Sequence, residues 1–233
     1  MRWYALLAVL AFAVSARPAA AQQPGGASSA AAATASTASL PPDIDPQSLN
    51  RLPRVRREDL DDFGKNLYDR VTGDSRLLGL DGPIGIRLHS PRVSDYMNTG
   101  NRYLRFEAGI EPSVRELAIL VVARELDSQF EWAAHEAAGL KEGLEQRVID
   151  VVKHRRPLTG IGEKEAAVIQ LGREALGRHK VEPETFARAL RHFGQQGIVN
   201  LVSLMGHYSA TAMLLTTFDQ QLRPGQEALL PMP

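Results

Sequence analysis

Apolar and polar residues alternate with the period of an α-helix over most of residues 50–225. Apolar side chains recur at steps of three and four, and no stretch alternates long enough to indicate a β-strand. Serine or proline opens several of these stretches, as is typical of helix N-termini. The pattern predicts helices over residues 57–71, 90–106, 112–127, 128–139, 144–153, 163–178, 183–193 and 198–218. The expected fold class is therefore all-α, a multi-helix bundle.

Two of the predicted helices have an unusual composition. Residues 117–123 contain no polar side chain, so this helix should be buried on every side at the centre of the bundle. The last helix has no charged residue between Phe193 and Asp219, and in this it resembles a membrane span. Its serines, threonines, Asn200 and His207 are polar enough to favour a buried or oligomer-forming helix, and no membrane span is expected in the mature protein.

The N-terminus has the pattern of a secretory signal peptide. Arg2 is followed by ten apolar residues, 5–14, and by the small residues 19–21 of a cleavage site. We expect residues 1–21 to be removed and the protein to be exported, to the periplasm if the source is Gram-negative. The alternative is an uncleaved membrane anchor.

Composition divides the rest of the chain into three parts. Residues 22–49 are rich in alanine, serine and proline and have almost no large apolar side chains, so they are expected to form a disordered linker. Residues 50–225 carry the helical pattern and should form one domain. Residues 226–233 should form an extended tail.

Charge and cysteine content exclude several classes of function. The 27 basic and 27 acidic residues balance, so nothing indicates a nucleic-acid partner. The sequence has no cysteine, which excludes disulfides, thiolate metal ligands and thiol-based redox chemistry.

Glu131 and His135 form the first candidate site. They are four residues apart and share one helix face, where the carboxylate could orient the imidazole for general acid or base chemistry. The same residues allow a structural role, because Ser128 and Glu131 also fit a capping box. The pattern alone favours the cap.

Other polar residues could belong to the same site. Glu116 lies in the first turn of the apolar helix, where it could be a second site carboxylate, a favourable helix-end charge or a partner of Arg115. Along the last helix, polar side chains at steps of three and four either line a pocket or meet a partner helix: Asn200, Ser203, His207 and Thr211. A metal site from Glu131, His135 and His207 is conceivable, but no stronger metal-binding motif is present, and neither a metal nor another cofactor is expected.

Several motifs occur in the order found in the carboxymuconolactone decarboxylase family, which the chain resembles over most of residues 55–225. The motifs are residues 85–91 (GIRLHSP), 103–106 (YLRF), 115–120 (RELAIL), 131–135 (EWAAH), 193–197 (FGQQG) and 201–204 (LVSL) with Tyr208. The resemblance implies a bundle of the alkyl hydroperoxidase D type that assembles into homotrimers or homohexamers. In the peroxidase branch, a Cys-x-x-Cys pair precedes a histidine; here Ser128 and Glu131 occupy the cysteine positions and His135 matches the histidine. Glu116 matches an upstream glutamate of the family.

The resemblance also makes Glu116, Glu131 and His135 the expected catalytic residues. The substrate-binding residues do not follow from the resemblance; from the residues themselves we expect His89, Arg105, Trp132 and His207 to bind the substrate. The expected reaction is a cofactor-free, decarboxylase-like lyase reaction on a small carboxylated lactone or a related acid. The alternatives are a non-catalytic small-molecule-binding protein and a peroxide-handling enzyme that uses no thiol.

Overall fold

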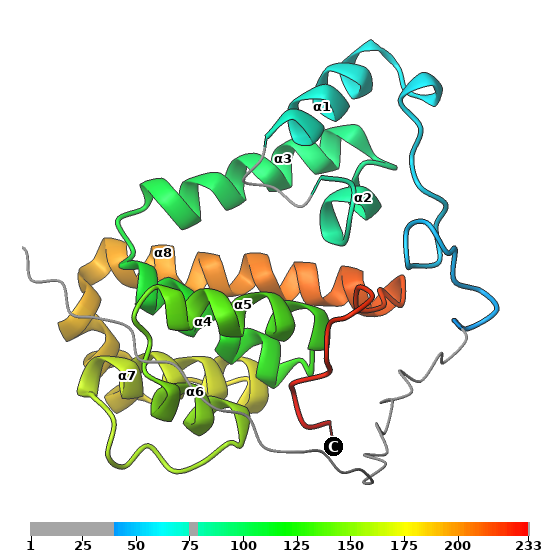
Figure 1. Ribbon diagram of the computed structural model, residues 1–233. Helices are drawn as coiled ribbons and strands as arrows, with labels where there is room; N and C mark the ends of the chain where they lie inside the picture. Colours follow the sequence, from blue (N-terminus) through cyan, green and yellow to red (C-terminus); the bar gives the residue numbers. More distant parts are fainter. Residues whose placement is uncertain (1–39, 75–78, 233) are drawn as a thin grey trace, which may run out of the picture. The chain divides into compact units, whose positions relative to one another are not determined.

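Helices form the domain over the residues that the computed structural model describes, which are 40–74 and 79–232 (Figure 1). Within these residues no β-strand occurs, and an isolated bridge joins Asp45 to Asn50. The all-α prediction is confirmed. The predicted signal peptide, 1–21, and most of the predicted linker lie outside the described residues.

Eight α-helices and three shorter helical segments follow one another along the described chain. The α-helices are α1 (Asp62–Gly73), α2 (Pro83–Arg87), α3 (Pro91–Arg102), α4 (Pro112–Glu125), α5 (Gln129–Lys141), α6 (Gln146–Lys153), α7 (Glu163–Gly172) and α8 (Pro183–Thr217). A 3-10 turn precedes α1 at Arg57–Asp59, and π-helical turns extend α3 at Tyr103–Glu107 and α7 at Arg173–Arg178.

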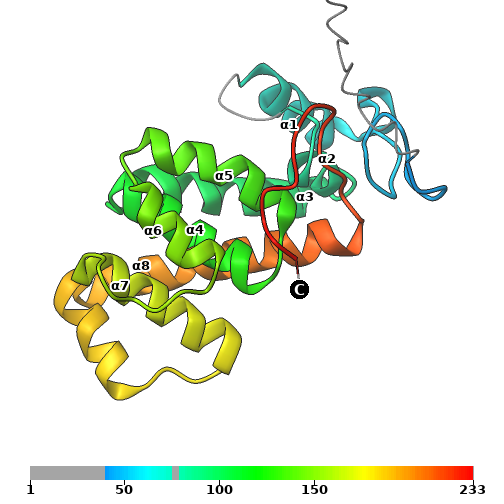
Figure 2. The same ribbon diagram turned by 60° about the horizontal axis from the view of Figure 1, so that its bottom comes forward.

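Helix α4 lies at the centre of the domain, as its apolar sequence predicts. It packs against α5, α6, α7 and α8, which surround it in both views (Figures 1 and 2). Every residue from 117 to 123 is at most 1% exposed. Burial of each leucine, isoleucine or valine contributes about 1.5–3 kcal/mol to stability, so α4 provides a rigid base for the polar groups at its ends.

Helix α8 contains the break that the sequence predicts between two helices at 183–193 and 198–218. At Gly194 the backbone is not helical, with φ of 65° and ψ of −180°, so two helical parts meet at a kink. Glycine tolerates this positive φ, which lets the chain change direction there. By length and composition α8 could cross a membrane, but half of its most apolar window is buried inside the protein, as in the core helix of a bundle.

Helix α2 was not predicted, because its sequence has the residues of a turn. Gly82 has a positive φ of 64°, and a Cβ atom at Gly85 would come within 1.9 Å of the Leu80 carbonyl oxygen. Both glycines are therefore required for the tight approach of α2 to the preceding chain. This short helix carries Arg87 into the interior.

Residues 40–49 differ from the disordered linker expected over 22–49. Ile44 and Ser48 are buried, and the Ser48 hydroxyl donates to the Leu52 carbonyl oxygen at 2.6 Å. The Arg51 amide donates to the carbonyl oxygen of Phe218, beyond the end of α8. The reason is local: a few apolar and turn-forming residues at the end of a low-complexity stretch are enough to anchor it.

Candidate active site

The site is built where α4 and α5 pack side by side. Glu116 lies in the second turn of α4, and Glu131 and His135 lie one turn apart on α5. Glu116 is 1% exposed, Glu131 5% and His135 8%. Glu116 is far in sequence from Glu131 and His135, yet all three ionisable side chains are buried together.

His135 lies between the two carboxylates. Its Nδ1 is 2.6 Å from Glu116 Oε2, and its Nε2 is 3.3 Å from Glu131 Oε2. The ring also meets the edge of the Tyr208 ring, with 5.3 Å between centroids and an interplanar angle of 89°. The imidazole therefore has a fixed orientation.

Glu116 is an ionised anchor for this imidazole. Burial raises its pKa, but hydrogen bonds from His135 and Arg115 and the charge of Arg105 outweigh burial and bring the pKa to about 2. Arg115 Nε donates to Glu116 Oε1 at 2.9 Å, and Arg105 Nη2 does so at 3.3 Å. An ionised Glu116 accepts the Nδ1 proton of His135, which leaves Nε2 as the nitrogen that exchanges a proton.

The two carboxylates also set the protonation state of His135. Burial alone would lower its pKa, but the hydrogen bonds and charges of Glu116 and Glu131 raise it above the ordinary value of 6.5. The raised pKa favours the protonated form of His135, which can donate a proton from Nε2.

The capping box favoured by the sequence pattern is not formed. Ser128 precedes α5 as its N-cap, but its side chain makes no cap hydrogen bond. Its amide instead donates to the Ala123 carbonyl oxygen at 2.7 Å, so the donor that Glu131 would bind is already satisfied. Glu131 is thus available to face His135.

A cavity of about 100 Å³, here called the inner cavity, lies against this group. It is lined by Pro83, Ile84, Arg87, Asn98, Asn101, Arg105, Phe130, Glu131, Ala134, His135, His207, Tyr208 and Thr211. The lining comes from α2, α3, α5 and α8 and from the π-helical turn after α3. Such π-helical turns are frequent at functional sites, and this one carries Arg105.

Arg87 and Tyr208 belong to the site although they were not among the predicted site residues. Arg87 is 6% exposed, and its Nη2 donates to Thr211 Oγ1 at 2.9 Å. Burial lowers the pKa of Arg87, while the charge of Glu131 raises it in part. Burial raises the pKa of the Tyr208 phenol, so this side chain is neutral. Tyr208 was already part of the last family motif in the sequence, which joins it to residues 201–204.

His207 lines the inner cavity, as predicted, and is neutral. Burial and the positive charge of Arg87 lower its pKa to about 4. The predicted polar stripe of α8 is split: Thr211 also lines the cavity, whereas Asn200 donates to the Ala108 carbonyl oxygen and Ser203 is exposed. One part of α8 therefore lines the inner cavity, while Ser203 on the same helix faces the surface.

Two predicted substrate-binding residues are not at the inner cavity. His89 is exposed, and its Nε2 lies 3.0 Å from the Pro53 carbonyl oxygen. Trp132 is fully buried in the core, where its Nε1 donates to Glu136 Oε2 at 2.7 Å. The reason is helical phase, because Trp132 follows Glu131 directly and adjacent residues point to different faces. Arg105, by contrast, lines the cavity as predicted.

In the described part of the chain, no group of three or more histidine, aspartate or glutamate side chains is arranged to hold a metal ion.

A family model matches part of the chain. The sequence model described as the carboxymuconolactone decarboxylase family matches residues 91–171, which include α4, α5 and the three ionisable residues. No curated protein gives a significant match.

Solved structures share the fold at low sequence identity. An alkylhydroperoxidase core, an uncharacterised peroxidase-related protein from Ralstonia eutropha, superimposes with a TM-score of 0.61 and 13% identity, covering 75% of this chain and 93% of that one. A protein of unknown function from Agrobacterium tumefaciens, described as an antioxidant defence protein of the same type, gives 0.55 and 17%, covering 61% and 98%. A debrominase variant in complex with 2,3,4-tribromopyrrole gives 0.56 and 9%, covering 73% and 90%.

Proposed function

Because residues 91–171 form a domain of the carboxymuconolactone decarboxylase family, we propose that the protein is a cofactor-free enzyme that decarboxylates a small carboxylated lactone or a related acid. The observation that carries the proposal is the buried His135, which lines the inner cavity and is held by Glu116 on one nitrogen while the other faces Glu131.

The charges around the inner cavity favour an anionic substrate. Arg87, Arg105 and Arg115 accompany the two carboxylates of Glu116 and Glu131, and protonated His135 adds a further positive charge. The buried group therefore has an excess of positive charge. A substrate carboxylate next to Arg87 and Arg105 would balance it.

His135 supplies the proton that the reaction consumes. As the bond to the carboxylate carbon breaks, carbon dioxide leaves and the electron pair enters the conjugated lactone as an extended enolate. Positive charges around the cavity stabilise this enolate. Nε2 of His135 then gives its proton to the enolate carbon, and the neutral imidazole regains a proton from water.

A lactone assay with matched histidine variants tests the proposal. The protein is incubated with 4-carboxymuconolactone, and carbon dioxide release is measured. We expect His135→Gln to lose at least a hundredfold in turnover, since general acid catalysis contributes about 10²–10⁴-fold. His89→Gln, which changes an exposed histidine outside the cavity, should stay within twofold of wild type.

Equal turnover by His135→Gln and wild type would refute the assigned role. Binding of the lactone acid without carbon dioxide release would favour the non-catalytic binding protein instead.

We further propose that the protein self-associates through α8. Val199, Val202 and Met213 are 63%, 46% and 72% exposed on a helix with no charge between Phe193 and Asp219. Burying them against a second copy would remove this apolar surface from water. Light scattering after size-exclusion chromatography should show an oligomer at micromolar concentration, and a stable monomer would contradict this.

A further inference from the structure

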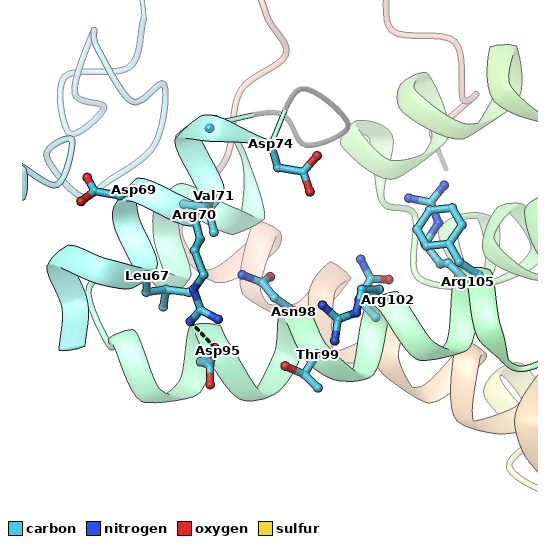
Figure 3. A pocket seen from close by; sticks show the side chains of 13 residues that line it. Leu67, Asp69, Arg70, Val71, Asp74, Asp95, Asn98, Thr99, Arg102 and Arg105 are labelled. Carbon is cyan, nitrogen blue, oxygen red and sulfur yellow. Dashed lines mark hydrogen bonds and ion pairs between the residues drawn. The ribbon is translucent and has the colours of Figure 1, made fainter.

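A second, larger cavity lies next to the inner one, between α1 and α3 (Figure 3). Its volume is about 570 Å³, more than five times that of the inner cavity. We call it the outer cavity. It is lined by Leu67, Asp69, Arg70, Val71, Gly73, Asp74, Asp95, Asn98, Thr99, Asn101, Arg102, Arg105 and Phe106.

The two cavities share three residues. Asn98, Asn101 and Arg105 line both, and they follow one another at steps of three and four along α3 and its π-helical extension. One helix face therefore runs from the outer cavity into the inner one. The two cavities therefore lie next to each other along α3.

At this shared face, two buried polar atoms lack a hydrogen-bond partner among the described residues. They are Asn101 Oδ1, an acceptor, and Arg105 Nε, a donor. Buried polar atoms are normally paired, because each has given up its hydrogen bonds to water. A ligand group that both donates and accepts, such as an amide or a hydroxyl, would satisfy the two atoms together.

Most of the charged side chains that line the outer cavity are paired within the protein. Arg70 donates to Asp95 at 2.8 Å, as Figure 3 shows, Asp69 binds Arg57, and Arg102 lies 3.4 Å from Glu107. Apolar surface comes from Leu67, Val71 and Phe106. Such a cavity suits an uncharged group with an apolar face.

We propose that the substrate has two parts: a small carboxylate-bearing head in the inner cavity and a bulkier uncharged body in the outer cavity, joined at Asn101 and Arg105 by a group that donates and accepts hydrogen bonds. This inference rests on the proposed function for the position of the carboxylate. It assigns the outer cavity as the determinant of substrate selectivity.

The origin of the outer cavity supports a role in selectivity. Helix α1 forms one of its sides, with Leu67, Arg70 and Val71. This helix lies outside residues 91–171, the segment that matches the family model. The reacting groups thus come from the matched segment, while one side of the space for the body comes from a helix outside it.

Four small molecules separate the parts of the proposed ligand. N-acetylglycine has the carboxylate head and an amide, and hippurate adds a phenyl body. Benzoyloxyacetate replaces the amide N–H of hippurate with an ester oxygen, and hippuramide replaces the carboxylate with a neutral amide. Isothermal titration calorimetry measures the dissociation constant of each for the full domain.

For the wild type, we expect hippurate to bind at least tenfold more tightly than each of the other three. Thr99 lines the outer cavity alone, so Thr99→Trp should remove the advantage of hippurate over N-acetylglycine and leave N-acetylglycine within twofold. Val93→Trp is the matched control, an exposed α3 position outside both cavities, and should change neither affinity. Asn101→Leu should remove the difference between hippurate and benzoyloxyacetate.

The outcomes distinguish this inference from the proposed function. If N-acetylglycine binds and hippurate gains nothing, the outer cavity does not hold a body and the inference is wrong while the anion site stands. If hippurate and hippuramide bind alike, the carboxylate site of the proposed function is wrong. If no ligand of the series binds, both are wrong.

Discussion

The two carboxylates beside His135 lie in different regions of the protein. Glu116 belongs to the floor of the site, the packed end of α4, where Arg115, Arg105 and His135 all contact its carboxylate. Glu131 belongs to the wall, the α5 face that lines the inner cavity next to His135. The contacts of the floor fix the charge of Glu116 and the orientation of His135. The wall lines the inner cavity, where a bound ligand can change the balance of charge around Glu131 and His135. Stability and activity should therefore respond differently to the same substitution in the two regions.

The largest effect is expected at the floor. Glu116→Gln leaves the buried guanidinium of Arg115 and protonated His135 without their anion, and breaking a buried ion pair costs about 3–5 kcal/mol. The free energy of unfolding, measured by urea denaturation, should fall by about 3 kcal/mol. Glu142→Gln is the control, because it removes a more exposed partner of the same Arg115 at 3.6 Å and should cost less than about 1 kcal/mol. Equal losses in the two variants would contradict the role of the floor.

The next effect concerns pH. His135 acts as the proton donor, and its pKa is raised above 6.5 by Glu116 and Glu131. Turnover should therefore be maintained below pH 6.5 and fall about tenfold per pH unit once the pH exceeds the raised pKa. The stability that His135 contributes follows the same direction: it is complete below pH 6.5 and is lost as the pH rises through the folded-state pKa. A rate that increases over that range would show that His135 acts as a base.

A smaller and more selective effect is expected at the wall. Glu131→Gln removes a charge that favours protonated His135 but leaves the floor intact. The variant should melt within a few degrees of wild type and lose turnover or ligand binding by roughly tenfold, which is about 1.4 kcal/mol. The double variant with His135→Gln should lose little more than His135→Gln alone, because the two residues act as a unit. Unchanged activity would assign Glu131 a structural role.

His207, which lines the inner cavity from α8, tests the site at acidic pH. Its pKa falls from 6.5 to about 4 on folding, so between these values the unfolded chain binds a proton that the folded protein does not. Stability should fall as the pH decreases through this window. His207→Gln should reduce the loss between pH 7 and pH 5 by about 1 kcal/mol, allowing for partial exposure. The contribution of Glu116 to stability changes with pH only below 4.5, and that of His135 only above 6.5. An unaltered loss in this variant would therefore contradict the assignment.

No effect is expected from a thiol donor. Ser128 and Glu131 cannot form a thiolate or a disulfide, and the chain has no cysteine. Peroxide consumption coupled to a dithiol should stay at background, and turnover clearly above it would contradict the prediction.

The site could be predicted from the sequence where its residues are close together along the chain. The step of four from Glu131 to His135 placed both on one face of α5 by helix geometry alone. Glu116 and His135 are 19 residues apart, and their match to the family motifs, rather than spacing, indicated that they meet. His89 and Trp132 do not line the inner cavity, for a related reason: nearness to a motif in sequence says little about which way a side chain points.

The sequence by itself determined the helices and the central position of α4, because residues 117–123 have no polar group that could face water. It also determined the absence of thiol chemistry. Only the tertiary structure decided that Glu131 faces His135 instead of capping α5, since the Ser128 amide is taken by the Ala123 carbonyl. It alone brought Arg87 on α2 to Thr211 on α8, 124 residues later, and joined two cavities along one face of α3. The physical reason is that periodicity and capping act over one or two helical turns, whereas burial, charge balance and cavity shape depend on which helices pack together.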